Sequence, residues 1–205
     1  MLMKKYLSSH IAIFSFFYSI SIDANGPAEA CAKLIDDGLL EQAVSICTEA
    51  AEAGDRPSQT LLGELYDQQG DSVNAALWWY QAANAGYQPA RNLLAMKYYY
   101  GGSVFGPEKG WSKNYPAAFK LWSEDAEAGI AASQFMTGVM YFNGEGVEKD
   151  LPEAWFWLSL SLENGYKLAT DVLIELSTKI TPQQKNIAKE KLSIYHHQQP
   201  AAAVD

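Results

Sequence analysis

The stretch MTGVMYFNGEGVEKDLPEAWFW, residues 136–157, decides how the rest of the chain is interpreted. It places Gly138 three positions before Tyr141 and Ala154 three positions before Trp157, with the run GEGVEKD between the two pairs. Spacings of three and four residues mark one face of a helix. The stretch therefore predicts two helices that are joined by a glycine-containing turn.

The same pattern recurs along the chain. Each unit ends at a glycine, an alanine stands eleven residues before that glycine, and a large apolar residue follows the alanine by three. The glycines are Gly54, Gly86, Gly129 and Gly165, and the alanines are Ala43, Ala75, Ala118 and Ala154. Nine residues after the first three glycines comes a small residue, and a tyrosine follows it by three; the small residues are Gly63, Ala95 and Gly138. A period of about 20–50 residues is typical of helical solenoids, in which small residues let paired helices approach closely.

The segment from Ser133 to Trp157, S-x-F-M-T-G-V-M-Y-F-N-G-E-G-V-x-x-D-x-x-x-A-x-x-W, resembles a Sel1-like repeat, a relative of the tetratricopeptide repeat. The resemblance implies an all-α fold, a right-handed α/α solenoid of helix pairs with a C-terminal capping helix. It also implies a non-enzymatic protein–protein interaction module. The expected units are residues 26–55, 56–87, 88–130 and 131–166, followed by a cap at 167–195 and a flexible tail at 196–205.

The first 24 residues have the layout of a secretory signal peptide, because Lys4 and Lys5 precede the apolar run IAIFSFFYSISI, residues 11–22. The run is shorter than the ~20 residues that a membrane-spanning helix needs. We therefore expect export to the periplasm of a Gram-negative-type bacterium, without membrane insertion after cleavage. An uncleaved short anchor, favoured by Asp23 near the cleavage site, is the alternative.

Charge limits the classes of partner. Without Lys4, Lys5 and Asp23 the chain carries 13 basic and 23 acidic residues, a net charge of −10. Nucleic acid and anionic lipid repel such a body. We expect no nucleic-acid partner, and the charge favours a basic protein partner.

The chain has two cysteines, Cys31 and Cys47, which the repeat register places on facing sides of the first helix pair. Similar Sel1-like proteins use disulfides across helix pairs, so the resemblance implies a Cys31–Cys47 disulfide. Two reduced core cysteines are the alternative. The spacing is not C-x-x-C, so the pair is expected to be structural.

Enzyme chemistry has little support. No histidine lies between His10 and His196, so a Ser-His-Asp triad or a histidine-ligated zinc cannot form in the body of the chain. The pair Gly144 and Gly146 fits no phosphate-binding motif, because Lys149 stands where the dinucleotide fingerprint needs its third glycine. We therefore expect the loop to be scaffold, and no catalytic residue, metal ligand or cofactor is predicted.

The alternative is an enzyme that acts on the cell wall or on β-lactams through carboxylates. Some cysteine-rich Sel1-like proteins are associated with β-lactam binding or hydrolysis. The acidic cluster Glu64, Asp67 and Asp71 could supply such carboxylates, although a solvated acidic face is the simpler interpretation.

The predicted binding surface lies on the first helix of each unit, which lines the concave side in repeats of this type. There, residues that are not used for packing would hold a partner segment: Met96, Tyr99, Tyr100, Phe135, Val139 and Phe142, with Trp111 from the long loop. Glu64 and Asp67 in the second unit would orient a basic stretch of the partner. The role would be assembly of an envelope complex or an effector–immunity pairing. If the register is off by one, these side chains are core instead.

Overall fold

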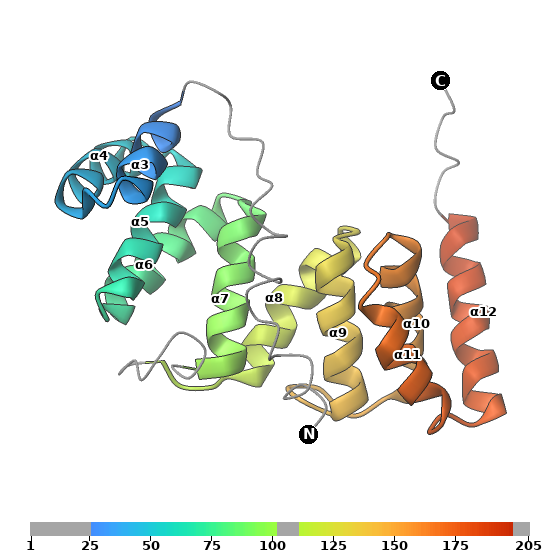
Figure 1. Ribbon diagram of the computed structural model, residues 1–205. Helices are drawn as coiled ribbons and strands as arrows, with labels where there is room; N and C mark the ends of the chain where they lie inside the picture. Colours follow the sequence, from blue (N-terminus) through green and yellow to red (C-terminus); the bar gives the residue numbers. More distant parts are fainter. Residues whose placement is uncertain (1–25, 102–110, 199–205) are drawn as a thin grey trace, which may run out of the picture. The chain divides into compact units, whose positions relative to one another are not determined.

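The computed structural model describes residues 26–101 and 111–198, and within those ranges every regular element is a helix (Figure 1). The helices are α3 (Pro27–Asp36), α4 (Leu40–Glu52), α5 (Arg56–Gln68), α6 (Ser72–Asn84), α7 (Gln88–Tyr100), α8 (Tyr115–Glu127), α9 (Ala131–Asn143), α10 (Leu151–Glu163), α11 (Ala169–Ser177) and α12 (Pro182–Gln198). The chain divides into two compact units between Ala90 and Arg91, and each is described by itself. The predicted signal peptide lies outside the described residues.

The helix ends follow from local chemistry. The side chains of Asp55, Asp71, Asn114 and Asp150 each accept a hydrogen bond from the backbone N–H three residues on, which caps α5, α6, α8 and α10. The unit-ending glycines adopt positive φ, between 83° and 91° at Gly54, Gly86, Gly129 and Gly165. No described helix is long and apolar enough to cross a membrane.

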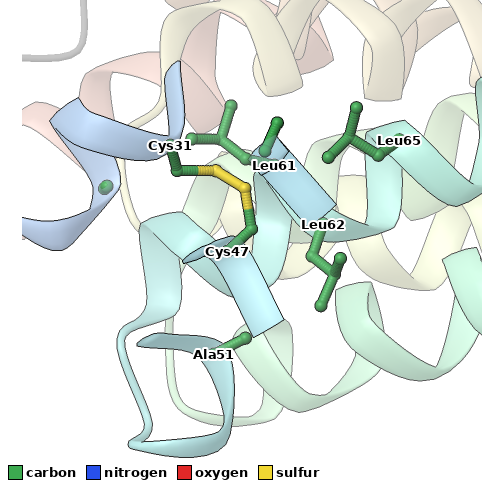
Figure 2. Packing of buried hydrophobic residues seen from close by; sticks show 8 residues of the cluster. Cys31, Cys47, Ala51, Leu61, Leu62 and Leu65 are labelled. Carbon is green, nitrogen blue, oxygen red and sulfur yellow. A yellow bond between two sulfur atoms is a disulfide. The ribbon is translucent and has the colours of Figure 1, made fainter. Parts of the chain in front are cut away.

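In the first unit, a disulfide joins Cys31 on α3 to Cys47 on α4, with their Cα atoms 5.2 Å apart (Figure 2). Both cysteines are fully buried and pack with Leu61, Leu62 and Leu65 of α5. The structure therefore contains the disulfide that the resemblance implied, in the core of the first helix pairs.

On α5 and on α9, one position must be small because the second helix of the pair approaches it closely. A Cβ atom added to Gly63 would lie 2.5 Å from Nε1 of Trp79, and one added to Gly138 would lie 2.7 Å from Cγ of Leu158. Cβ atoms do not come this close to other heavy atoms, so only glycine fits. The indole of Trp79 also donates to the Thr60 carbonyl oxygen over 3.0 Å, which fixes its position against α5.

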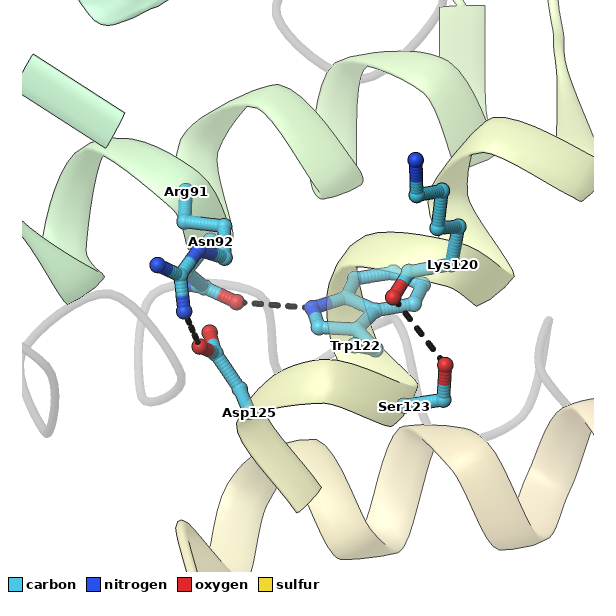
Figure 3. Close-up of polar contacts among 6 residues, drawn as sticks. All are labelled: Arg91, Asn92, Lys120, Trp122, Ser123 and Asp125. Atoms are coloured by element: carbon cyan, nitrogen blue, oxygen red, sulfur yellow. Dashed lines mark hydrogen bonds and ion pairs between the residues drawn. The ribbon is translucent and has the colours of Figure 1, made fainter. Parts of the chain in front are cut away.

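In the second unit, polar side chains join α7 to α8 inside the protein (Figure 3). Trp122 Nε1 donates to Asn92 Oδ1 over 2.9 Å, and Arg91 forms an ion pair with the buried carboxylate of Asp125. The buried side chains of Asn92, Trp122 and Asp125 thus have polar partners, as burial favours.

The C-terminal helix α12 covers α10, which confirms the predicted cap. Lys191 of α12 pairs with Glu153 and places its ammonium 4.4 Å from the ring centre of Phe156. Helix α12 continues through His196, whose Nε2 lies 2.9 Å from Glu163 Oε2, and it ends at Gln198, three residues beyond the expected end of the cap. Residues 199–205 lie outside the described part of the chain.

Candidate binding surface

The predicted binding residues are less accessible than the sequence suggested. Four are buried, with exposed fractions of 4% for Tyr99, 5% for Val139, 4% for Phe142 and 8% for Asp67. The other five are half-buried: Met96, Tyr100, Phe135, Glu64 and Trp111. Tyr99, Val139, Phe142 and Asp67 are therefore not exposed as expected, and the core alternative describes the first three of them. Binding of a partner by the predicted residues stays a prediction.

Neighbouring elements explain this burial. The ring of Tyr99 contacts those of Tyr100, Tyr115 and Trp122, at centroid distances of 4.9, 5.1 and 5.5 Å. Phe142 lies beneath two ammonium groups, 5.6 Å from that of Lys149 and 4.8 Å from that of Lys179. Apart from Tyr100, these covering residues come from α8 and from turns, so the pattern within one helix does not reveal them.

The loop after α9 brings an unexpected residue to this surface. Glu145 Oε2 accepts a hydrogen bond from Tyr99 Oη over 2.5 Å and another from Asn143 Nδ2 over 3.1 Å. Gly146 has a φ of 75°, and a Cβ there would lie 2.3 Å from the Tyr115 carbonyl oxygen. Glycine therefore lets the loop pass close to the start of α8, next to the position where Glu145 meets Tyr99.

Further aromatic side chains surround this contact. The Phe135 ring lies 5.1 Å from that of Tyr166, between centroids. The Tyr100 ring lies 4.9 Å from that of Tyr99, between centroids, and Tyr99 in turn donates to Glu145. Burial raises the pKa of Tyr100, and electrostatic interactions with Tyr166 and Glu145 raise it further. We call Glu145, Tyr99, Tyr100, Phe135 and Tyr166 the Glu145 cluster; all five belong to the second unit.

The phenols of the cluster are neutral donors at ordinary pH. Burial raises the pKa of Tyr99, and its hydrogen bond to Glu145 and the charge of that carboxylate raise it further. Burial also raises the pKa of Tyr166. The cluster is therefore one carboxylate among uncharged hydroxyl groups and aromatic faces, an arrangement that accepts hydrogen bonds and attracts cations.

The remaining predicted residues lie elsewhere. Glu64 and Asp67 are in the first unit, where burial raises the pKa of Tyr87 and the charges of Asp55 and Glu64 add to that effect. Trp111 packs edge-on against Tyr98, with ring centroids 6.0 Å apart. An orienting role for Glu64 and Asp67 stays a prediction.

Metal binding has no support in the described ranges. There, no group of three or more histidine, cysteine, aspartate or glutamate side chains is placed to hold a metal ion.

Comparison with known proteins identifies the family. The model of the Sel1 repeat matches residues 57–87 and 131–166, which are the second and fourth predicted units. The chain is a Sel1-like repeat protein. Its all-α repeat fold is also confirmed, because solved Sel1-repeat structures superpose on it.

Two curated relatives are similar in sequence. The chain is 29% identical to the chitin synthase regulator SKT5 of Saccharomyces cerevisiae over 154 residues, which cover 69% of this chain and 21% of that protein. It is 30% identical to the Sel1-repeat-containing protein YjcO of Escherichia coli K12 over 131 residues, or 62% of this chain and 54% of that one. The chain thus spans about a fifth and about half of their lengths.

Two solved structures are similar in fold. The protective antigen c5321 of uropathogenic Escherichia coli, described as displaying an SLR fold, has a TM-score of 0.62 at 28% identity, over 80% of this chain and 37% of that one. A Sel1 repeat protein of Oxalobacter formigenes has a TM-score of 0.60 at 26% identity, over 71% and 59% of the two chains. Sel1-repeat proteins are typically protein–protein interaction modules, and the fold is generally a non-enzymatic scaffold.

Proposed function

We propose that this Sel1-like repeat protein is an exported, non-enzymatic interaction module that binds a segment of a partner protein on the Glu145 cluster. The observation that carries the proposal is the gathering of half-buried aromatic side chains around a carboxylate. Tyr100 comes from α7, Phe135 from α9 and Tyr166 from the turn after α10. Met96, one turn before Tyr100 on the same helix, extends this surface.

The exposure of these side chains suits binding. A partner that covers a half-buried aromatic ring gains apolar contact without first having to order a free side chain, and such rings dominate many interfaces. Tyr99 and Phe142 are too deeply buried to touch a partner directly. Tyr99 packs against the half-buried ring of Tyr100, and its role in the proposal is to support that ring.

Two observations support export to the periplasm. The apolar run at residues 11–22 follows two lysines, as in signal peptides. The Cys31–Cys47 disulfide is of a kind that persists in oxidising compartments. In that compartment the module would assemble an envelope complex or neutralise an effector as its immunity partner. The relative SKT5 is named as a regulator of chitin synthase, that is, for its effect on another protein.

The test is affinity capture from intact periplasm with Phe135→Ala and Tyr100→Ala. Both side chains are half-buried, so the fold should persist, and circular dichroism checks the helical content. Val73→Ala on α6 is the control, since Val73 is 77% exposed and lies in the first unit. We expect each cluster variant to retain at least tenfold less partner than wild type, and Val73→Ala to retain all of it. Equal capture by all three variants would refute the proposal.

A further inference from the structure

We infer that the Glu145 cluster is a subsite for one cationic side chain, a lysine or an arginine, of the bound partner segment. This inference rests on the proposed function and names the chemistry of the group that the surface recognises.

The first argument is the charge of Glu145. Its carboxylate is half-buried, and Oε2 is held by the Tyr99 hydroxyl and the Asn143 amide. Among residues 26–101 and 111–198, no lysine, arginine or histidine forms an ion pair with it. Two neutral donors stabilise the carboxylate without cancelling its charge, so a negative charge is left at the surface.

The second argument is the set of aromatic rings in the Glu145 cluster. The faces of aromatic rings are negative and attract ammonium and guanidinium groups. Phe135 and Tyr166 place two rings 5.1 Å apart between centroids, and Tyr100 packs against Tyr99, which donates to the carboxylate. An anionic ligand would be repelled here, and a divalent metal would need more oxygen ligands than one carboxylate supplies.

The third argument is a filled example of the same arrangement in this chain. Lys191 pairs with Glu153 and at the same time lies over the ring of Phe156, 4.4 Å from its centre. One carboxylate and one aromatic face thus hold one lysine. The Glu145 cluster has the carboxylate and the rings, but its own loop lysine, Lys149, lies over Phe142 instead.

The charge of the whole chain agrees with such a partner. The chain carries a formal net charge of −9, which speeds the approach of basic segments and slows that of acidic ones. The Glu145 cluster would then select one residue of the segment that arrives.

The test is an NMR titration of the full chain with isotope-labelled tyrosine, using n-butylammonium, n-butylguanidinium and the neutral n-butanol as probes. We expect one or both cations to shift tyrosine ring signals saturably, with a Kd on the order of millimolar, as suits so few atoms. Tighter binding of butylammonium would indicate a lysine of the partner, and tighter binding of butylguanidinium would indicate an arginine. If neither cation binds more tightly than butanol, the inference is wrong.

Two variants locate the effect. Glu145→Gln keeps the shape and the acceptor oxygen and removes the charge, so we expect cation binding to weaken at least fivefold. Glu148→Gln, on the same loop and exposed, is the matched control and should leave binding unchanged. Should Glu145→Gln fail to fold, Tyr100→Leu removes a ring and should weaken binding at least threefold. Equal weakening by Glu145→Gln and Glu148→Gln, or none by Tyr100→Leu, would overturn the inference.

Partner capture separates this inference from the proposed function. If Phe135→Ala abolishes capture while Glu145→Gln leaves it intact, the surface binds the partner but not through a cation. If butylammonium or butylguanidinium binds and neither variant affects capture, the cation subsite stands and the proposed partner surface is wrong.

Discussion

In the first and the fourth helix pairs, the two helices meet at the same repeat position but through different residues. In α3 and α4, Cys31 and Cys47 occupy it and are covalently joined. In α9 and α10, Gly138 lets Leu158 approach to a distance at which no Cβ could fit. The repeat therefore requires close approach of two helix backbones at this point, and it does not require a particular residue type.

The disulfide of the first pair and the glycine–leucine contact of the fourth pair stabilise the fold in different ways. A disulfide stabilises largely by restricting the unfolded chain, whereas a glycine–leucine contact stabilises only the packed state. The first pair should respond to reductant and the fourth to added side-chain volume. The predictions below separate these responses.

The largest effect is expected from removing the disulfide. Closing a loop over 16 residues contributes about 3 kcal/mol, so Cys31→Ala with Cys47→Ala should lower the free energy of unfolding of the first unit by about that amount. Urea unfolding followed by circular dichroism measures it. Reductant should lower the free energy of unfolding of the wild type by the same amount and leave that of the double variant unchanged. If reductant left the urea midpoint of the wild type unchanged, this expectation would be wrong.

The next effect concerns the fourth pair. In Gly138→Ala the new methyl group meets the Leu158 side chain at 2.7 Å and the Ala154 carbonyl oxygen at 3.2 Å. Overpacking of this kind costs about 2 kcal/mol, and reductant should not change that figure. Leu158→Ala makes room, so the same substitution in that background should cost less than about 1 kcal/mol. A full penalty in the Leu158→Ala background would show that the clash is not with Leu158.

Alkaline pH should destabilise the turn of the fourth pair and leave the first pair, which has no tyrosine, unaffected. The folded pKa of Tyr99 is raised above its unfolded value of about 10. The stabilisation is therefore complete below about pH 10 and declines as pH rises towards the folded pKa, by about 1.4 kcal/mol per pH unit for one group. In Tyr99→Phe, urea midpoints measured between pH 9 and 11 should fall less steeply than in wild type. Identical slopes would mean that Tyr99 ionises as freely as in the unfolded chain.

The smallest effect concerns helix starts. Asp150 caps α10, accepting from the Glu153 N–H over 2.9 Å, whereas α4 begins after Leu39 with no side-chain cap. Leu39 is 44% exposed, so Leu39→Asp loses little packing. We expect it to stabilise the first unit by about 0.5–1 kcal/mol, measured by urea unfolding, with Leu39→Ala as the uncapped control. A midpoint no higher than that of Leu39→Ala would argue against a missing cap.

The repeat spacing predicted the helices well because it records contacts within one helix pair. The unit-ending glycines are local features, and they adopt positive φ in the structure, as suits the ends of helices. The burial of Tyr99 and Phe142 could not be predicted from the repeat spacing. Their covering residues, Tyr115 and Lys179, lie on other elements.

Glu145 shows the same limit more clearly. Its loop was interpreted as scaffold because Gly144 and Gly146 account for the turn, and both do adopt positive φ. Its hydrogen-bond partner Tyr99 is 46 residues away in the sequence, on the first helix of the preceding repeat unit. A lone acidic residue between two turn glycines was the available signal, and it does not identify its partner.

The most direct test of the central claim, that the Glu145 cluster binds the partner segment, is site-specific photo-cross-linking in intact cells. A benzophenone amino acid replaces Phe135 in one variant and the exposed Val73 in the other. The account predicts an adduct with a single protein from position 135, attached within a segment that contains lysine or arginine, and none from position 73. An adduct from position 73 with none from position 135 would contradict it.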